Sequence, residues 1–192
     1  MYEKYLSLAK MLKAHTRCND VLDIGCAKGF LVEGFLSASA KATGIDVSSY
    51  ALEKSAGDSK SFLLRADGSF IPYVDKSFDL VTAIGVLDYA RNPAQCMFEI
   101  SRVLRKGGVL LMTVATKSPD PYRRTVKSEE WWKKRASEVG LQYSHNDVGS
   151  IGSKTIRTLS RSFWVQNPLL TNFLLKVFGY TIMIFRMEPD SH

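Results

Sequence analysis

The sequence predicts a doubly wound α/β fold, built on a mostly parallel sheet. Short runs that are apolar on both faces alternate with segments of helical period along residues 20–115. The first run leads into a glycine-containing turn, VLDIGCAKGF at 21–30. Three runs carry an aspartate at their ends: Asp23, Asp46 and Asp67. Such sheets bind ligands at the carboxyl ends of their strands, so these acids also mark the candidate site.

The first half of the chain alternates between strand and helix. Apolar side chains at helical spacing predict a helix over residues 3–14. Ser48 is the expected N-cap of a later helix, because its side chain can accept a backbone hydrogen bond. Strands are expected at 21–24, 42–46 and 61–67, with helices at 30–37 and 48–54.

The second half begins with the most continuous apolar run and then becomes less regular. Residues 77–84 predict a fourth strand, and Pro93 opens a helix that runs to about Leu104. The sequence RKGG at 105–108 predicts a turn before a fifth strand at 109–114. Beyond residue 116 we expect a helix at 128–139 and strands at 141–148 and 180–187.

Length and composition predict one domain in a reducing compartment. The 192 residues suit a single domain, with a core at about 18–116 and a substrate-side part at about 117–192. Three widely spaced cysteines form neither a metal-binding pattern nor a disulfide framework. The N-terminal residues lack the apolar segment of a signal peptide or a membrane span. A cytoplasmic protein without a metal site is therefore expected.

The net charge of +7 is uneven, with +2 over residues 1–116 and +5 over 117–192. A basic tail attracts nucleic acid, an anionic membrane surface or an acidic substrate, and a solvated face is the simpler alternative. The sequence contains no RNA-binding motif and no dense basic cluster, so a nucleic-acid partner is not favoured.

The glycine-containing turn predicts a site for a ligand that carries a ribose. The backbone of such a turn can approach a ligand closely, and the helix that follows offers free N–H groups. Asp46 lies about 20 residues further on, at the spacing of an acid that accepts hydrogen bonds from ribose hydroxyls. Asp46 could instead cap the helix that follows it.

The turn does not match the fingerprint of a pyrophosphate dinucleotide. It reads Gly25-Cys26-Ala27-Lys28-Gly29, and Asp23 stands two residues before its first glycine. A carboxylate at this position repels a pyrophosphate but suits an ammonium or sulfonium group. A nucleoside that carries an amino acid is therefore a better ligand than NAD.

Four stretches together resemble the class I S-adenosylmethionine-dependent methyltransferases, and most of all the methyltransferase domain 11 group. They are VLDIGCAKG, GIDVS, LLRADGSFIPYVDKSFDLVTAIGVLDYARNP and LRKGGVLLMTV, which follow the order of the family's motifs over residues 18–116. The resemblance implies a Rossmann-like methyltransferase fold, with a mostly parallel seven-stranded sheet and an antiparallel strand near the C-terminus. It further implies an enzyme that transfers a methyl group. It also implies S-adenosyl-L-methionine as cofactor and S-adenosyl-L-homocysteine as product.

The resemblance assigns roles near the turn by position. The backbone around Gly25, Cys26 and Gly29 would pack against the methionine part and the ribose of the cofactor. Asp23 would help to hold the methionine amino end, and it could also cap the turn. Asp46 would bind the ribose hydroxyls.

Further roles fall on the later strands. Val47 would pack beside the adenine, and Asp67 would accept a hydrogen bond from the adenine amino group, with Gly68 next to it. Asp67 could instead be a turn residue. Ile84 and Gly85 would line the pocket near the methyl donor.

Two departures from the family pattern concern affinity and catalysis. Alanine stands at position 27, where the family often has glycine, and it disfavours positive φ. The family's V-L-E-H segment reads V-L-D-Y at 86–89, so no histidine base can be transferred to this chain. The catalytic residues are unassigned, and the weak candidates are Asp88, Tyr89 and His15, with Tyr122 and His145 behind them.

The acceptor is not encoded by a recognisable motif. A small molecule, apolar or aromatic, is the first hypothesis. A nucleic-acid or protein methyltransferase and a non-catalytic binding module are the alternatives. Residues 162–179 are too short and too interrupted by Pro168 to span a membrane. They are compatible with a lid over the substrate, peripheral contact with a membrane, or a helix packed on the sheet.

Overall fold

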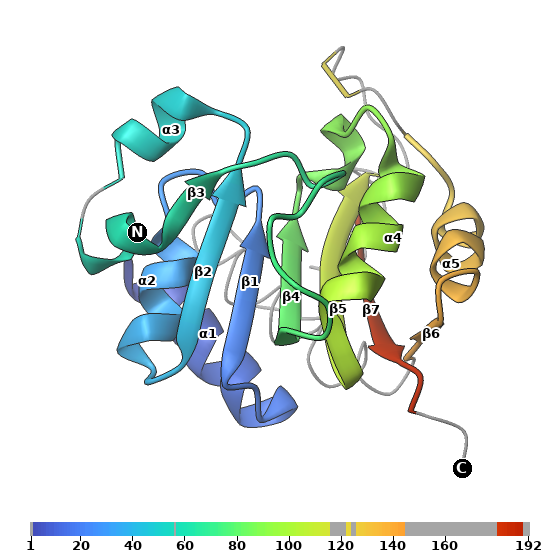
Figure 1. Ribbon diagram of the computed structural model, residues 1–192, viewed down its shortest axis with the longest axis horizontal. Helices are drawn as coiled ribbons and strands as arrows, with labels where there is room; N and C mark the ends of the chain where they lie inside the picture. The colour runs from blue at the N-terminus through green and yellow to red at the C-terminus, as the bar shows by residue number, and fades with distance from the viewer. Residues whose placement is uncertain (1, 56, 116–121, 124–125, 145–179, 190–192) are drawn as a thin grey trace.

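One seven-stranded sheet organises the chain, as the computed structural model shows for residues 2–55, 57–115, 122–123, 126–144 and 180–189 (Figure 1). The strand order is β3-β2-β1-β4-β5-β7-β6. The strands are β1 Asp20–Ile24, β2 Lys41–Asp46, β3 Leu63–Arg65, β4 Phe78–Ile84, β5 Leu104–Ala115, β6 Leu141–Tyr143 and β7 Tyr180–Met187. The α-helices are α1 Tyr2–Thr16, α2 Phe30–Ser37, α3 Ser49–Glu53, α4 Pro93–Val103 and α5 Glu129–Ser137, and two short 3₁₀ segments are η1 Asp58–Phe62 and η2 Leu87–Tyr89.

The strand directions confirm the predicted fold class. β1 pairs in parallel with β2 and β4, and the parallel ladder continues from β2 to β3 and from β4 to β5. β7 runs antiparallel to both of its neighbours, β5 and β6. The sheet is therefore mostly parallel, as the apolar runs predicted, and it has one reversed strand near the C-terminus, as the resemblance implied.

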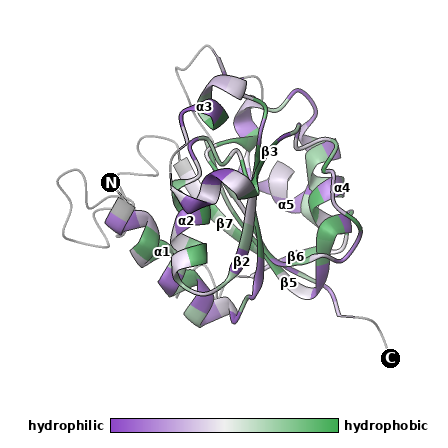
Figure 2. Cartoon of the chain, turned by 60° about the vertical axis from the view of Figure 1, so that its left-hand side comes forward, coloured by the Kyte–Doolittle hydropathy of each residue, from purple (hydrophilic) through white to green (hydrophobic). Residues whose placement is uncertain are grey.

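Two apolar cores cover the two faces of the sheet. On one face, α1 and α2 pack through residues that include Leu8, Leu12 and Phe35. On the other face, α4 and α5 pack through residues that include Ile100 and Trp132. Figure 2 shows the hydrophobic colouring on the strands and on the inward sides of the helices. Among the described helices, none is long and apolar enough to cross a membrane.

The largest differences from the expected boundaries concern three strands. β3 is short, because residues 58–62 form a 3₁₀ segment before it. β6 ends at Tyr143, and residues 145–148 of the predicted strand lie outside the described residues. The turn predicted at 105–108 lies within β5, where the ladder with β4 shifts register between Phe78 and Leu80. Gly107, at a φ of 73°, lets the backbone continue through this irregularity.

Serine side chains cap two of the helices, and the cap predicted at Ser48 is confirmed. Ser48 Oγ accepts a hydrogen bond from the N–H of Ala51 at 3.1 Å. Ser128 Oγ accepts from the N–H of Trp131 at 3.2 Å. Each cap satisfies a backbone donor that the first turn of the helix leaves free.

Arg102 of α4 fixes the loop that joins β3 to β4. Its guanidinium donates to both oxygens of Glu99 and to Asp75 at 2.8 Å. It also donates to the backbone carbonyl oxygens of Ile71 at 2.8 Å and Tyr73 at 2.7 Å. One side chain therefore satisfies carboxylates and carbonyls of a loop that has no regular structure of its own.

Replacing Arg102 by leucine is expected to lower the free energy of unfolding by about 2–3 kcal/mol, because it leaves a partly buried carboxylate and two carbonyls without their donor. Urea unfolding measures the loss. The matched control is Arg91→Leu, which removes an exposed arginine and should change stability by about 0.5 kcal/mol at most. Equal losses in the two variants would contradict the role assigned to Arg102.

Candidate functional site

The predicted site residues gather at the carboxyl edge of the sheet. Asp23 lies near the end of β1, Asp46 ends β2, and Asp67 follows β3 by two residues. Ile84 ends β4, which lies next to β1 in the sheet. The parallel ladder thus brings side chains from four strands to one edge.

The turn after β1 has an unusual backbone. Gly25, Ala27 and Gly29 have φ angles of 72°, 48° and 79°, which fall in the left-handed region. The N–H groups of Gly25 and Cys26 both donate to the carbonyl oxygen of Ile45, at 2.8 and 3.1 Å. The turn is therefore anchored to β2, the strand that carries Asp46.

Close contacts require two glycines here, one in the turn and one in the neighbouring strand β2. A Cβ on Gly25 would lie 2.5 Å from Cγ2 of Val86, which belongs to the loop after β4. A Cβ on Gly44 would lie 2.6 Å from Cβ of Cys26. Both distances are shorter than any normal contact, so a side chain at either glycine would displace the turn.

Asp46 accepts backbone hydrogen bonds from the turn and from the start of the next helix. Its Oδ2 accepts the N–H of Ala27 at 2.8 Å, and its Oδ1 accepts the N–H of Ser48 at 2.8 Å. A carboxylate offers about four acceptor positions, so both oxygens keep capacity for a ligand. The hydrogen bond to Ala27 stabilises a residue whose left-handed φ is otherwise unfavourable.

Ala27→Gly is expected to raise the free energy of unfolding by about 0.5–1 kcal/mol, because glycine adopts positive φ without a steric cost. Urea unfolding at neutral pH measures the gain. The control is Ala14→Gly in the exposed part of α1, where glycine should lower stability by about 1 kcal/mol. A loss at position 27 equal to that at position 14 would show that the left-handed conformation carries no strain.

Asp23 is a buried acid beside this turn. Its side chain is 5% exposed, and its Oδ1 accepts the hydroxyl of Thr82 at 2.6 Å. Burial raises the pKa of Asp23 to about 7, the hydrogen bond from Thr82 lowers it, and the charge of Asp46 raises it. Asp23 therefore changes charge near neutral pH, and a cation bound nearby would favour its ionised form.

Cys26 is a packing residue. Burial raises the pKa of its thiol, and the nearby carboxylates of Asp23 and Asp46 raise it further. The thiol stays protonated and contacts Gly44 from within the core. This environment excludes Cys26 as a nucleophile.

Asp67 and Val47 are both exposed at the edge. Asp67 Oδ1 accepts the N–H of Ser69 at 2.8 Å, and its other oxygen makes no hydrogen bond with the described residues. Val47 is 60% exposed although it is apolar. A Cβ on Gly68 would lie 3.3 Å from Ile24, so this glycine lies tightly against the end of β1. An acceptor and an apolar side chain are therefore available on the same side of the site.

Asp88, a weak catalytic candidate, is fully buried. Its Oδ2 accepts hydrogen bonds from the N–H of Ala115 at 2.8 Å and from Nη1 of Arg123 at 3.1 Å, while Oδ1 has no hydrogen-bond partner among the residues that the structure describes. Burial raises the pKa of Asp88, and its two hydrogen-bond partners lower it. The carboxylate thus joins the loop after β4 to the end of β5, and it does not reach solvent.

Tyr89, the next candidate, lies at the rim. It is 38% exposed, and its Oη accepts Nε of Arg123 at 3.3 Å. The guanidinium of Arg123 also lies 5.3 Å from the centre of the Tyr89 ring. Tyr89 is therefore an accessible aromatic side chain with a fixed position.

His15 is placed away from the site. α1 ends at Thr16 and β1 begins at Asp20, so His15 lies at the amino edge of the sheet. Its Nδ1 donates to the carbonyl oxygen of Met11 at 2.9 Å. The structure therefore does not bring His15 together with Asp88 and Tyr89. Tyr122 is 80% exposed, and His145 lies outside the described residues.

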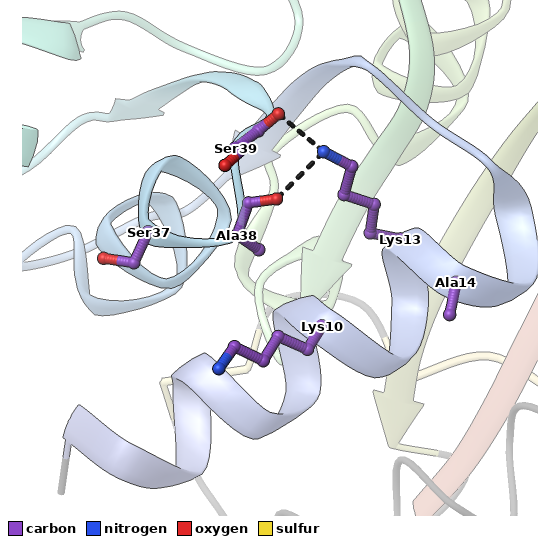
Figure 3. Close-up of a pocket in the computed structure, with 6 residues that line it drawn as sticks. All are labelled: Lys10, Lys13, Ala14, Ser37, Ala38 and Ser39. Atoms are coloured by element: carbon purple, nitrogen blue, oxygen red, sulfur yellow. Dashed lines mark hydrogen bonds between the residues drawn. The ribbon is translucent and has the colours of Figure 1, made fainter.

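A shallow cavity of about 460 Å³ lies at the same amino end, between α1 and the end of α2 (Figure 3). Lys10 and Lys13 line it from α1, and Ser37, the last residue of α2, lines it together with the two residues that follow. Figure 3 shows Lys13 Nζ donating to the carbonyl oxygens of Ala38 and Ser39. Lys13 therefore caps the C-terminal end of α2, and the cavity does not contain any predicted site residue.

Three residues of the site were missed by the sequence analysis. Thr82 was detectable, because it is a polar residue between the apolar residues Val81 and Ala83 of a buried strand. No local sequence pattern marks Val86 or Arg123 as a site residue. Val86 contacts Gly25 and Arg123 contacts Asp88, and both partners are distant in the sequence. In the described part of the chain, no group of three or more His, Cys, Asp or Glu side chains is placed to hold a metal ion.

Comparison with known sequences identifies related proteins. Residues 22–112 match the family described as "Methyltransferase domain". A ubiquinone biosynthesis O-methyltransferase of Dechloromonas aromatica is 30% identical over 122 residues, which cover 58% of this chain and 50% of that protein. A protein of the same name from Thiobacillus denitrificans is 26% identical over 177 residues, 89% of this chain and 73% of its own. The chain thus spans about half the length of the first of these relatives.

Solved structures share the fold at low identity. The YcgJ protein of Bacillus subtilis superposes with a TM-score of 0.69 at 16% identity, over 96% of this chain and 99% of its own. A 1,6-didemethyltoxoflavin-N1-methyltransferase of Burkholderia thailandensis, with bound 1,6-didemethyltoxoflavin and S-adenosylhomocysteine, has a TM-score of 0.63 at 14% identity. That alignment covers 96% of this chain and 78% of the other.

Proposed function

We propose that this chain, which through residues 22–112 belongs to the class I S-adenosylmethionine-dependent methyltransferases, transfers a methyl group from S-adenosyl-L-methionine to a small-molecule acceptor. The observation that carries the proposal is the group of three aspartates at the ends of adjacent parallel strands, set around a left-handed glycine turn. Such an arrangement suits a ligand with a ribose, a base and a cationic amino acid.

The described residues offer a matching partner for each part of this cofactor. Asp46 retains acceptor capacity for the ribose hydroxyls, and Asp67 has an oxygen that no described residue occupies. Exposed Val47 would contact the adenine, with Gly68 beside it. Asp23, buried beneath the turn, would favour the positive charge of the methionine part.

Methyl transfer depends mainly on how the methyl donor and the acceptor are positioned. When bound, S-adenosyl-L-methionine supplies a methyl group already activated by a positively charged sulfur. The chain's own contribution is to orient that methyl group toward the acceptor and to exclude water. Ile84 and Gly85, at the end of β4, are the residues proposed to lie nearest to it.

The acceptor is proposed to be apolar or aromatic, with an oxygen as the methylated atom. The names of the sequence relatives, ubiquinone biosynthesis O-methyltransferases, support an oxygen. The half-buried Ile84 and the accessible ring of Tyr89 support an apolar contact surface beside the methyl donor.

Calorimetric titration with S-adenosyl-L-homocysteine tests this function. We expect one binding site per chain, with an affinity that falls when Asp46 is replaced. NAD is the control ligand and should produce no binding heat, because Asp23 disfavours a pyrophosphate. Absence of binding by S-adenosyl-L-homocysteine would overturn the proposed function.

A further inference from the structure

β3 is the last strand at one end of the sheet. Among the strands that the structure describes, it pairs with β2 alone, in parallel. It consists of Leu63, Leu64 and Arg65, and it lies within the continuously described residues 57–115. An edge strand presents backbone N–H and C=O groups that can pair with a strand of another chain.

The backbone groups of β3 alternate between β2 and the outer edge. The N–H of Ala66 donates to the carbonyl oxygen of Asp46, on β2, at 3.1 Å. The carbonyl oxygen of Phe62 accepts the hydroxyl of Thr43, also on β2, at 2.6 Å. The groups of even-numbered residues thus point toward β2, and those of odd-numbered residues point outward.

Leu63 and Arg65 therefore direct their backbone groups to the outer edge. The N–H of Leu63 is satisfied within the chain, because it donates to the carbonyl oxygen of Lys60 in η1. Neither the carbonyl oxygen of Leu63 nor the N–H of Arg65 has a hydrogen-bond partner among the described residues. One acceptor and one donor, two residues apart, are thus available on this edge.

The side chain between these two residues is apolar and exposed. Leu64 pairs with Ile45, which belongs to the core under α4 and α5, so Leu64 lies on that face of the sheet. Figure 1 shows α4 over the other half of the sheet, and the connection from β3 to β4 contains no helix. Leu64 is 45% exposed and Phe62 is 46% exposed. They form an apolar patch beside the free backbone groups.

The charged residue of β3 does not obstruct this edge. Charged side chains on edge strands commonly prevent pairing with other chains. Arg65 is exposed, but its Nε donates to the carbonyl oxygen of Val47, just beyond the end of β2, at 3.2 Å. The guanidinium is therefore held toward the neighbouring strand, away from the outer edge.

We propose that β3 pairs with β3 of a second copy of this chain, antiparallel and around a two-fold axis at Leu64. In this register the N–H of Arg65 in each copy donates to the carbonyl oxygen of Leu63 in the other. The two Leu64 side chains lie directly opposite each other, as a cross-strand apolar pair. The two sheets then form one continuous sheet across an isologous interface.

A second copy fits this edge because the edge is complementary to itself. The free acceptor and the free donor lie one residue before and one residue after Leu64, so a two-fold axis there satisfies both. The charges agree with the same direction of pairing. Lys60 precedes the strand and Asp67 follows it, so antiparallel pairing brings the basic end of each copy toward the acidic end of the other.

The test is sedimentation equilibrium of the full chain at concentrations up to about 1 mM, because a short edge strand makes a small and weak interface. We expect wild type to dimerise in this range. Leu64→Lys should raise the dimer dissociation constant about tenfold or more, since it replaces the central apolar pair by two like charges. The matched control is Phe98→Lys, which places the same charge on an exposed apolar residue of α4 and should dimerise as wild type does.

A mixture of two variants tests the two-fold register. Leu64→Lys and Leu64→Glu should each self-associate weakly, and their equimolar mixture should associate more tightly than either alone, because opposite charges then face each other. Hydrogen exchange provides a second readout. The N–H of Arg65 should exchange more slowly as the concentration of wild type rises, and it should not do so in Leu64→Lys.

Three outcomes would overturn the proposed pairing. A wild type that stays monomeric at every concentration would leave this edge to a strand of a different protein. Equal dimerisation of wild type and Leu64→Lys would place the interface elsewhere. A mixture that associates no better than its components would exclude a two-fold axis at Leu64. These measurements need no cofactor, so failure of the proposed function is seen separately, as the absence of S-adenosyl-L-homocysteine binding.

Discussion

Replacing Asp46 by alanine is expected to weaken the binding of S-adenosyl-L-homocysteine by about a hundredfold or more. Hydrogen bonds to a charged group contribute about 1.5–3 kcal/mol each, and a carboxylate can accept from both ribose hydroxyls. The same substitution removes the acceptor of the Ala27 and Ser48 N–H groups. The turn would then lose the contact that holds its left-handed alanine, so the loss of affinity has two physical sources.

A second substitution separates these two sources. Asp46→Asn keeps one oxygen acceptor and so can retain one of the backbone hydrogen bonds, but it removes the charge. Its affinity should lie between those of wild type and Asp46→Ala in the same calorimetric titration. Asp58→Ala, in the exposed first turn of η1, is the control and should bind as wild type does. Wild-type affinity in Asp46→Ala would contradict the assignment of Asp46 to the ribose.

Much of this site was predictable because it depends on strand order alone. The aspartates Asp23, Asp46 and Asp67 follow apolar runs, and a parallel sheet brings the ends of such runs to one edge. The displacement of His15 to the opposite edge follows from the same rule. A helix that ends just before the first strand begins must end at the amino edge.

Side-chain pairings between distant segments were not predictable. Asp88 looked like a candidate base in the sequence, but the structure places it in a buried pair with Arg123, 35 residues away. No local pattern encodes such a pair. The left-handed conformation of Ala27 was not predictable either. It is stabilised by the hydrogen bond from the Ala27 N–H to Asp46, which is 19 residues away.

The second large effect is on stability and comes from Asp23. Ionisation of a buried carboxylate lowers the free energy of unfolding. The pKa of Asp23 in the folded chain is about 7, above its ordinary value of 3.8. The folded state therefore holds a proton that the unfolded state releases as pH rises from about 4 to 7. Over that window the free energy of unfolding should fall, by an amount of up to about 4 kcal/mol.

Asp23→Asn is expected to be more stable than wild type at pH 8, and the difference should shrink as the pH falls toward 5. The neutral amide can still accept the Thr82 hydroxyl but never ionises. Urea unfolding at pH 5, 6, 7 and 8 measures the trend. Asp79→Asn is the control, and it should be less stable than wild type. Burial raises the pKa of Asp79, but hydrogen bonds from Arg105 and from the N–H groups of Asn19 and Asp20 lower it overall.

The gain in stability at position 23 should be accompanied by a loss of binding. A cationic amino group near Asp23 favours the ionised carboxylate. The affinity of wild type for S-adenosyl-L-homocysteine, which carries such a group, should therefore increase as pH rises through 7. Asp23→Asn should bind more weakly and with little dependence on pH between 6 and 8. If the variant kept both the affinity and the pH dependence of wild type, Asp23 would be a purely structural acid. A perturbed pKa at a buried carboxylate is typical of a functional site, and a bound cation would offset the cost of burying an ionised Asp23.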